Sequence, residues 1–275
     1  MTWQSMDAPS SRRMPDWRTP FSGWDTDPDL SMVALVANHT LDLYAAALLW
    51  AAADHRASLI VAAGPQRAGK TTLLGAYRDL LPPDTQPVYL RGRQEPFDWV
   101  DKVDIKRAYV LVNELSSHTS FYLWGPAAKR LLALVAQGYR FGATLHADTA
   151  AEVLEYLTQS GLGVGLPELL GVHLVANIGV GWRGDDVVRR LTALTLITPH
   201  DGDSVNTVEL ALWDENEDEW ERNEDPGVMR LVEQRLGMRA ESLEVDLRNR
   251  QATLQGLLDR GVTTVEAVVK AIRGR

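Results

Sequence analysis

Short apolar runs alternate with helix-like patterns through the first two thirds of the chain. Residues 58–63 and 108–112 are almost fully apolar, which is typical of strands buried on both faces. Residues 69–81 have a helical pattern, which ends at Pro82 and Pro83 because proline cannot continue a helix. Strands separated by helices predict a parallel sheet with right-handed crossovers. The same alternation predicts strands at 87–90 and 140–145, and helices from Thr40 to about His55, from Pro126 to Gly138 and from Thr149 to about Gln159.

The last third of the chain changes pattern twice. Three segments alternate like β-strands and are joined by Gly- and Asp-rich turns, so we expect them to form an antiparallel edge of the sheet. Residues 226–275 are helical in composition, with breaks at Gly237 and Gly261 that predict about three helices. The three strand segments are residues 173–182, 187–197 and 207–213.

The composition mainly excludes several classes of functional site. The 275 residues are 45% apolar, which is enough for a sizeable α/β core without disulfide or metal support. There are no cysteines, so thiol nucleophiles, disulfides and cysteine-based metal sites are excluded. The six histidines are scattered, so no zinc-binding helix with paired histidines can form. The apolar stretch 43–53 is too short to span a bilayer and is interpreted as a buried helix.

The net charge of −9 is concentrated in one segment. Residues 214–225 hold eight acids and one arginine, which gives −7 and leaves −2 for the rest of the chain. Overall charge therefore predicts no nucleic-acid partner. The acidic segment itself is predicted to be a solvated loop.

One segment carries a strong chemical signal. Residues 64–71, GPQRAGKT, match the phosphate-loop pattern, and they lie between an apolar strand and a helix, as that mechanism requires. In such a loop the backbone N–H groups and the helix N-terminus face phosphates. Lys70 is expected to reach the β- and γ-phosphates of ATP or GTP, and the Thr71 hydroxyl is expected to be a ligand of Mg²⁺. The predicted nucleotide-binding residues are Gly64, Pro65, Gln66, Arg67, Ala68, Gly69, Lys70, Thr71 and Thr72.

Two further candidates stand at strand ends. Glu114 follows the strand 108–112, where it could orient or deprotonate the attacking water directly or through the Mg²⁺ shell; the alternative is an exposed strand-end carboxylate. His146 follows the strand 140–145, and taken alone it is better explained as a structural histidine. Residues 179–184 fit a dinucleotide-binding pattern, but another strand follows them, so a β-turn is the preferred interpretation.

These motifs together resemble the type II/type IV secretion ATPase superfamily. The phosphate loop, the strand ending in Asn113-Glu114 and the segment 138–148, GYRFGATLHAD, carry the resemblance, and residues 144–147 match the histidine box of that family. Segments between Leu210 and Ile272 resemble the family's C-terminal part. The resemblance implies a RecA-like P-loop NTPase core with a C-terminal helical subdomain. We divide the chain into an irregular N-terminal tail (1–35), this core (36–213) and the helical subdomain (226–275).

The resemblance also implies a function. It predicts an ATPase that uses Mg²⁺ and forms a homo-oligomer, expected to be a hexameric ring, in the cytoplasm at the inner face of the membrane. An integral-membrane platform protein of a secretion or pilus system is the expected partner. Glu114, His146 and Glu95 are the expected catalytic residues, with Mg²⁺ near Thr71 and Glu114. The tryptophans of the N-terminal segment, Trp3, Trp17 and Trp24, would dock on a partner or on the chain's own surface.

The chain departs from the family pattern at two places. The family's acidic pair would fall on Arg91-Gly92, where neither residue is an acid, and Glu95 or Asp98 would have to replace it. The family's N-terminal domain, which donates arginines to a neighbouring subunit, has no counterpart among these residues, so Arg91, Arg93 or Arg107 or another protein would supply that charge. These departures favour an alternative, a hydrolysis-impaired regulatory or scaffolding subunit that works with a full-length ATPase paralogue. A small-molecule kinase is a third interpretation.

Overall fold

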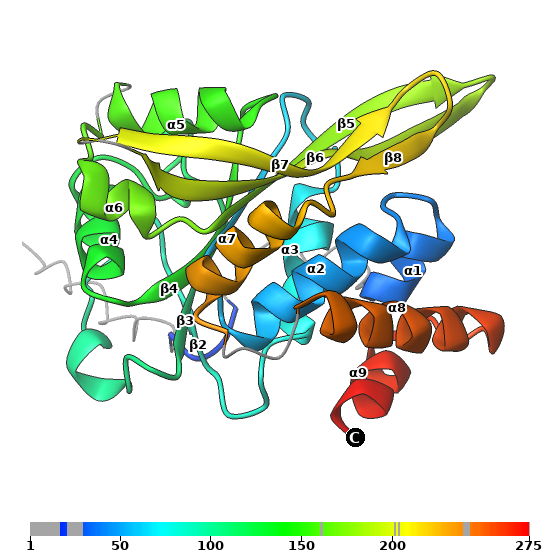
Figure 1. The fold of residues 1–275 in the computed structure, drawn as a ribbon. Coiled ribbons are helices and arrows are strands. Elements are labelled where there is room, and N and C mark those ends of the chain that lie inside the picture. Colours follow the sequence, from blue (N-terminus) through cyan, green and yellow to red (C-terminus); the bar gives the residue numbers. More distant parts are fainter. Residues whose placement is uncertain are drawn as a thin grey trace, which may run out of the picture.

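The computed structural model describes residues 17–20, 30–159, 162–200, 202, 204–238 and 243–274, and Figure 1 shows its fold. The helices are α1 (Met32–Ala37), α2 (Leu43–Asp54), α3 (Lys70–Asp79), α4 (Pro126–Ala136), α5 (Ala150–Thr158), α6 (Leu166–Leu170), α7 (Pro226–Leu236), α8 (Leu243–Asp259) and α9 (Val265–Arg273), with a short 3-10 helix at Val100–Lys102. The strands are β1 (Leu59–Ala62), β2 (Gln86–Tyr89), β3 (Ala108–Val112), β4 (Arg140–Leu145), β5 (Leu174–Arg183), β6 (Asp186–His200), β7 (Ser204–Asp214) and β8 (Glu219–Arg222).

All of these strands belong to one sheet. Its order is β2-β3-β4-β1-β5-β6-β7-β8. The strands from β2 to β5 pair in parallel, and β6, β7 and β8 continue the sheet as an antiparallel edge. The predicted fold class is confirmed: an α/β protein with a mainly parallel sheet and an antiparallel edge, consistent with a RecA-like P-loop fold. Strand β1 lies between β4 and β5, so the segment that follows it emerges in the middle of the sheet.

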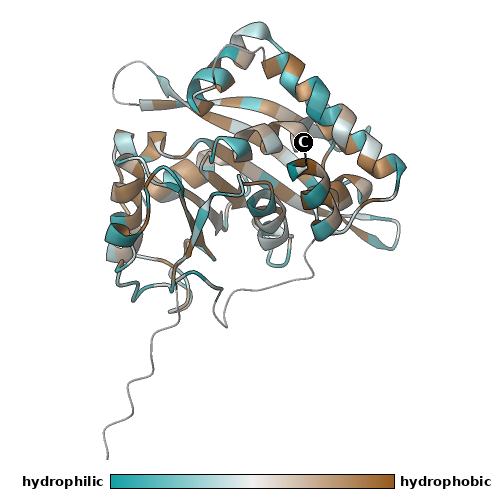
Figure 2. Cartoon of the chain, turned by 90° about the horizontal axis from the view of Figure 1, so that it is seen from below, coloured by the Kyte–Doolittle hydropathy of each residue, from teal (hydrophilic) through white to brown (hydrophobic). Residues whose placement is uncertain are grey.

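The core lies on both faces of this sheet. Leu59 and Val61 pack into one apolar cluster with α1, α2, α3 and the C-terminal helices, whereas Ile60 and Ala62 pack into a second with α4, α5 and α6. This division follows from the period of two in a strand. In Figure 2 the strands inside the molecule are largely hydrophobic, and the outer helices show hydrophilic turns toward solvent. Helices α7, α8 and α9 contribute to the first cluster, so the C-terminal segment shares a core with α2 and α3.

Helix boundaries follow local capping. Thr149 caps α5 by accepting a hydrogen bond from Glu152 N at 3.1 Å, and Gly237 ends α7 in the left-handed conformation, both as predicted. Helix α2 starts later than predicted: its cap is Asp42, not Thr40, and Asp42 Oδ1 accepts from Ala45 N at 2.8 Å. A carboxylate is at least as good a cap as a hydroxyl, and its charge favours a helix N-terminus, so Asp42 competes with Thr40, two residues before it.

The N-terminal helix was not predicted. Helix α1 begins at Met32, within the range 1–35 that the sequence assigned to an irregular tail. Ser31 Oγ caps it by accepting from Ala34 N at 3.0 Å. With six residues, α1 has too little pattern to identify from sequence alone, and its stability comes from burial of Met32 and Val33. Trp17 packs partly buried beside the edge strand β2, and its carbonyl accepts from Tyr89 N at 2.8 Å; Trp3 and Trp24 lie outside the described residues.

The acidic segment 214–225 is not a solvated loop, and that prediction is wrong. It contains β8, which pairs with β7, and the carboxylate of Asp218 is buried. Arg190 donates to both oxygens of this carboxylate, at 2.7 and 2.9 Å. Charge alone predicted exposure, but a buried acid with a two-pronged guanidinium partner is stable. Other acids of the segment, such as Glu215 and Glu217, are exposed as expected.

Strands β5 and β6 form a long hairpin that extends beyond the helices (Figure 1). Gly179 and Gly181 lie within β5, and Gly184 begins the turn with a φ of +60°. The interpretation of this glycine pattern as a turn between two strands is therefore confirmed. Among the described residues, no helix combines the length and apolar character needed to cross a bilayer.

His173 is buried between positive groups at the amino end of β5. Its Nδ1 lies 3.2 Å from Ser58 N, and its Nε2 lies 3.0 Å from a guanidinium nitrogen of Arg140. Both neighbouring groups are hydrogen-bond donors, so neither can accept a hydrogen bond from a protonated His173 ring. Burial, followed by the charges of Arg140 and Arg235, lowers the pKa of His173 to about 2.

This arrangement predicts a specific acid sensitivity. The unfolded chain binds a proton at this histidine near pH 6.5 and the folded chain does not, so stability is complete above pH 6.5 and falls as pH decreases toward 2. Between pH 7 and pH 5 His173 alone should reduce the free energy of unfolding by about 2 kcal/mol. Urea unfolding at both pH values measures this loss. His173→Gln, which cannot titrate, should show a smaller difference between the two pH values; an equal difference would contradict the assignment.

Candidate functional site

The phosphate loop links β1 to α3 with an unusual backbone. Arg67 has a φ of +58° and Gly69 a φ of +99°, and Gly69 precedes the first residue of α3 without a side-chain cap. Gly69 therefore offers no side-chain acceptor to the N–H groups of the first turn of α3. An anion can bind to these N–H groups instead. Gly64 is needed for another reason. Its N–H donates to Asp148 Oδ1 at 2.9 Å, and a Cβ at this position would lie 2.2 Å from the same oxygen.

Three adjacent strands bring the predicted residues to one edge. In the order β3-β4-β1, the carboxyl ends carry Glu114, His146 and the phosphate loop. A cross-strand bond fixes the ends of β3 and β4: Thr144 Oγ1 donates to Asn113 O at 2.5 Å, and Leu115 N donates to Thr144 O at 2.9 Å. The site is thus built on strand termini, whose positions the sheet hydrogen bonds determine.

Lys70, His146 and Glu114 form a chain of polar contacts. Lys70 Nζ lies 3.4 Å from His146 Nδ1 and 3.5 Å from Pro65 O, and His146 Nδ1 lies 3.1 Å from Gly64 O. His146 Nε2 lies 3.5 Å from Glu114 Oε2. The histidine therefore stands between the lysine and the carboxylate, so a change in the position of one can be transmitted to the other.

The electrostatics of this chain favour an anionic ligand. Lys70 is only 7% exposed, and burial lowers its pKa while the charge of Glu114 raises it. Its two contacts at 3.4–3.5 Å are long for hydrogen bonds of an ammonium group. Glu114 is 6% exposed, and its buried Oε1 has no hydrogen-bond partner among the residues that the structure describes. A buried carboxylate oxygen without a partner is costly, so a water molecule or a cation is expected to satisfy it.

A cleft of about 300 Å³ connects these groups, and its walls are more polar than apolar. The residues fit a nucleotide polyphosphate with Mg²⁺: a loop of backbone donors, a buried lysine, a hydroxyl at Thr71 and an orphan carboxylate oxygen. The lining residues are Gln66, Arg67, Ala68, Gly69, Lys70, Thr71, Thr72, Asn113, Glu114, His118, Thr119, Tyr122, Thr144 and His146.

Glu95 is a predicted catalytic residue that the structure does not bring into this cleft. Its Oε2 accepts from Arg91 N at 2.8 Å and its Oε1 accepts from Phe97 N at 3.0 Å. Both oxygens are therefore used to shape the loop after β2. The other candidate, Asp98, is exposed and pairs with Lys102 at 3.3 Å.

The proposed sources of additional positive charge are dispersed. Arg107 precedes β3 and donates to Asp84 O at 2.9 Å, at the edge of the sheet opposite the cleft. Arg93 donates to Ser117 O, and Arg91 lies 4.0 Å from Asp98. The contacts of Arg93 and Arg107 join different loops, and none of the three arginines lines the cleft in the part of the chain that the structure describes.

Comparison with known proteins identifies no family for this chain. No protein-family model and no curated protein sequence matches it. Among solved structures, the chain is similar to the ATPase DotB of Legionella pneumophila with 13% sequence identity and a TM-score of 0.35. The match extends over 82% of this chain and 62% of that protein. The function is therefore inferred from the cleft and its residues.

Two polar residues beside the phosphate loop were not predicted to have a role. Asp148 accepts from Gly64 N, and its own N–H donates to Glu152 Oε2 at 2.7 Å. Arg189 of β6 donates to Arg67 O from Nε and from a terminal nitrogen, each at 3.3 Å. The sequence offered a signal that Asp148 lies near the site, because this residue stands two positions after His146. It offered no such signal for Arg189, because the approach of Arg189 to the loop depends on how the antiparallel hairpin is placed.

Proposed function

We propose that the chain is a Mg²⁺-dependent ATP-binding and ATP-hydrolysing protein. The observation that carries the proposal is the convergence, in one cleft, of a phosphate loop, the buried Lys70 and a strand-end carboxylate with an oxygen that has no hydrogen-bond partner among the described residues. Lys70 and the loop N–H groups hold the phosphates, and Thr71 and Glu114 are the residues that would hold Mg²⁺, directly or through water. When bound, Mg²⁺ neutralises charge that develops on the phosphate oxygens.

In this proposal Glu114 acts on the attacking water. Its Oε1 accepts a hydrogen bond from the water, whose oxygen then forms a bond to the γ-phosphorus as the bond to the β,γ-bridging oxygen breaks. The water proton passes to the carboxylate or to the released phosphate, and ADP leaves. His146 contacts both Glu114 and Lys70, so it is in a position to respond to the γ-phosphate that Lys70 binds.

The larger role that we propose is that of a motor subunit in a secretion or type IV pilus-like machine. Its support is the motif resemblance, from the phosphate loop through Asn113-Glu114 to the histidine segment 144–147. In this role the chain forms a homo-oligomeric ring, expected to be hexameric, at the inner face of the membrane, and passes force to an integral-membrane platform protein. ATP binding and hydrolysis would close and release subunit interfaces in turn.

A second candidate has its own support. Arg91-Gly92 stand where the resemblance places an acidic pair, and both oxygens of Glu95 are used by backbone N–H groups. This favours a nucleotide-binding regulatory or scaffolding subunit that needs a full-length ATPase paralogue for hydrolysis. Such a subunit would bind ATP with the same loop, so binding alone does not separate the two candidates.

Calorimetric titration of the chain with ATP, with Mg²⁺ and with EDTA, tests the shared part of the proposal. We expect saturable binding that Mg²⁺ strengthens. Sedimentation of the same samples reports whether nucleotide promotes a ring. Failure to bind ATP under both conditions would overturn both candidates; binding with phosphate release only after mixing with a paralogue would favour the second.

A further inference from the structure

A second cleft lies on the other side of the phosphate loop. Its volume is about 450 Å³, and its walls are more apolar than those of the first cleft. The two clefts share Arg67, Ala68, Gly69 and Thr72, so the loop is the wall between them. The remaining walls of the second cleft are Leu30, Leu35, Asn38, Thr40, Leu73, Ile178, Val187, Val188, Arg189 and Arg190.

Arg189 is the charged group of this cleft that touches the phosphate loop. Its two donors share one acceptor, Arg67 O, at 3.3 Å each, and its Cδ lies 3.5 Å from the point where a Cβ on Gly69 would stand. A guanidinium has five N–H groups in a planar fork. Within the part of the chain that the structure describes, two long bonds to a single carbonyl leave the rest of this fork available to a ligand that enters beside the loop.

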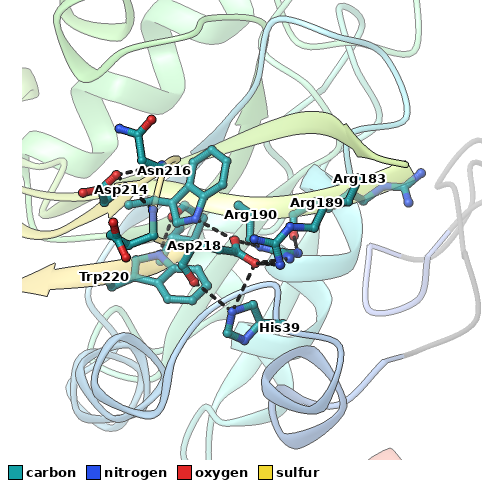
Figure 3. A network of polar contacts seen from close by, with 11 residues as sticks. His39, Arg183, Arg189, Arg190, Asp214, Asn216, Asp218 and Trp220 are labelled. Carbon is teal, nitrogen blue, oxygen red and sulfur yellow. Dashed lines mark hydrogen bonds and ion pairs between the residues drawn. The ribbon is translucent and has the colours of Figure 1, made fainter. Parts of the chain in front are cut away.

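The cluster around Asp218 contacts the backbone of Arg189 (Figure 3). Arg190 donates to both Asp218 oxygens, and through another terminal nitrogen it donates to the backbone carbonyl of Arg189 at 3.0 Å. The side chains of Arg190 and Asp218 are each 6% exposed. Trp213 Nε1 donates to Asp218 Oδ1 at 3.0 Å, and Arg183 lies 2.8 Å from Oδ2.

The cluster joins elements that are far apart in sequence. His39, in the connection between α1 and α2, lies 3.0 Å from Asp218 O and 3.5 Å from Oδ2 through Nε2. The hydrogen bonds from Arg190 keep the pKa of the Asp218 carboxyl well below its usual value, so the anion persists at all ordinary pH. The carboxylate thus fixes the strand position from which Arg189 reaches the loop.

We propose that the second cleft receives the nucleoside end of the nucleotide, that Arg189 contacts its ribose, and that Asp218 positions Arg189 through Arg190. A ligand whose β- and γ-phosphates lie beside Lys70 continues past Gly69 and Thr72, the residues that line both clefts. The apolar walls at Leu35, Ile178 and Val188 suit a flat base. The inference rests on the proposed function, because it concerns the same bound nucleotide.

Binding of ATP and of inorganic tripolyphosphate to the native chain and to Arg189→Ala tests this assignment. Tripolyphosphate offers the phosphate chain without a nucleoside. We expect Arg189→Ala to weaken ATP binding by about tenfold or more, and to change tripolyphosphate binding by less than about twofold. Arg189→Lys should recover part of the ATP affinity. Arg248→Ala removes a surface arginine of α8 and serves as the control, with both affinities unchanged.

The role of Asp218 is tested with Asp218→Asn, which keeps the shape and removes the charge. We expect a higher KM for ATP with a smaller change in kcat, and no further loss of ATP affinity when Asp218→Asn is added to Arg189→Ala. A purely structural role would lower the unfolding temperature without changing the ratio of ATP to tripolyphosphate affinity. Since Asp218→Asn can also impair folding, the two Arg189 variants carry the test independently.

Two results would overturn the assignment. Equal weakening of ATP and tripolyphosphate by Arg189→Ala would mean that this arginine only shapes the phosphate loop. Unchanged ATP binding in the same variant would mean that the nucleoside lies elsewhere. A native chain that binds neither ligand would instead contradict the proposed function itself, so the two failures are distinguishable.

Discussion

Lys70→Ala is expected to abolish measurable ATP binding, with a loss of affinity of about 100-fold or more. The ammonium group is buried in the cleft, and its contacts with the described residues, Pro65 O at 3.5 Å and His146 Nδ1 at 3.4 Å, are long, so its charge is available to phosphates. Removing a buried charge that pairs with a polyanion costs several charge-assisted hydrogen bonds at once. Titration with a fluorescent ATP analogue measures the loss.

The control for this prediction is Lys102→Ala, which removes an exposed lysine that pairs with Asp98. That variant should bind ATP as the native chain does, and both variants should unfold in the same cooperative manner. If Lys70→Ala retained ATP affinity within a few fold, the phosphate loop would not be the nucleotide site.

Glu114→Gln is expected to separate binding from hydrolysis. The amide keeps the size of the side chain but cannot accept a proton from water, so turnover should fall by about 10²–10⁴-fold while ATP affinity stays within a few fold. The structural reason is that Glu114 Oε1 is buried and unpaired among the described residues, at the carboxyl end of β3 and close to His146.

Phosphate release and ATP binding, measured on the same preparation, check this prediction. Glu244→Gln, on the exposed surface of α8, is the matched control and should leave both quantities unchanged. Turnover in Glu114→Gln equal to that of the native chain would assign the water-activating role to another group.

Much of the fold could be predicted because its signals are local. The apolar run 58–63 predicts a buried strand, and the pattern that follows predicts α3 up to the prolines. The acidic segment could not be interpreted correctly, because the partners that bury Asp218 are remote in sequence: Arg190 is 28 residues away and His39 is 179 residues away. Short elements such as α1 depend on tertiary packing rather than on their own pattern.

The candidate site divides in the same way. Glu114, His146 and the phosphate loop could be expected together, because the carboxyl ends of adjacent parallel strands meet at one edge. The position of Glu95 was not predictable, because its loop turns the carboxylate toward Arg91 N and Phe97 N. Arg189 reaches the loop from an antiparallel strand whose placement no local pattern determines.

Steady-state phosphate release in the presence of Mg²⁺ and ATP, measured over a range of protein concentrations, tests the central claim most directly. We predict turnover by the native chain that rises more steeply than linearly with concentration, as expected when subunits assemble, and that is lost in Lys70→Ala. Phosphate release by the native chain no greater than that of Lys70→Ala at every concentration would contradict the claim that this chain hydrolyses ATP by itself.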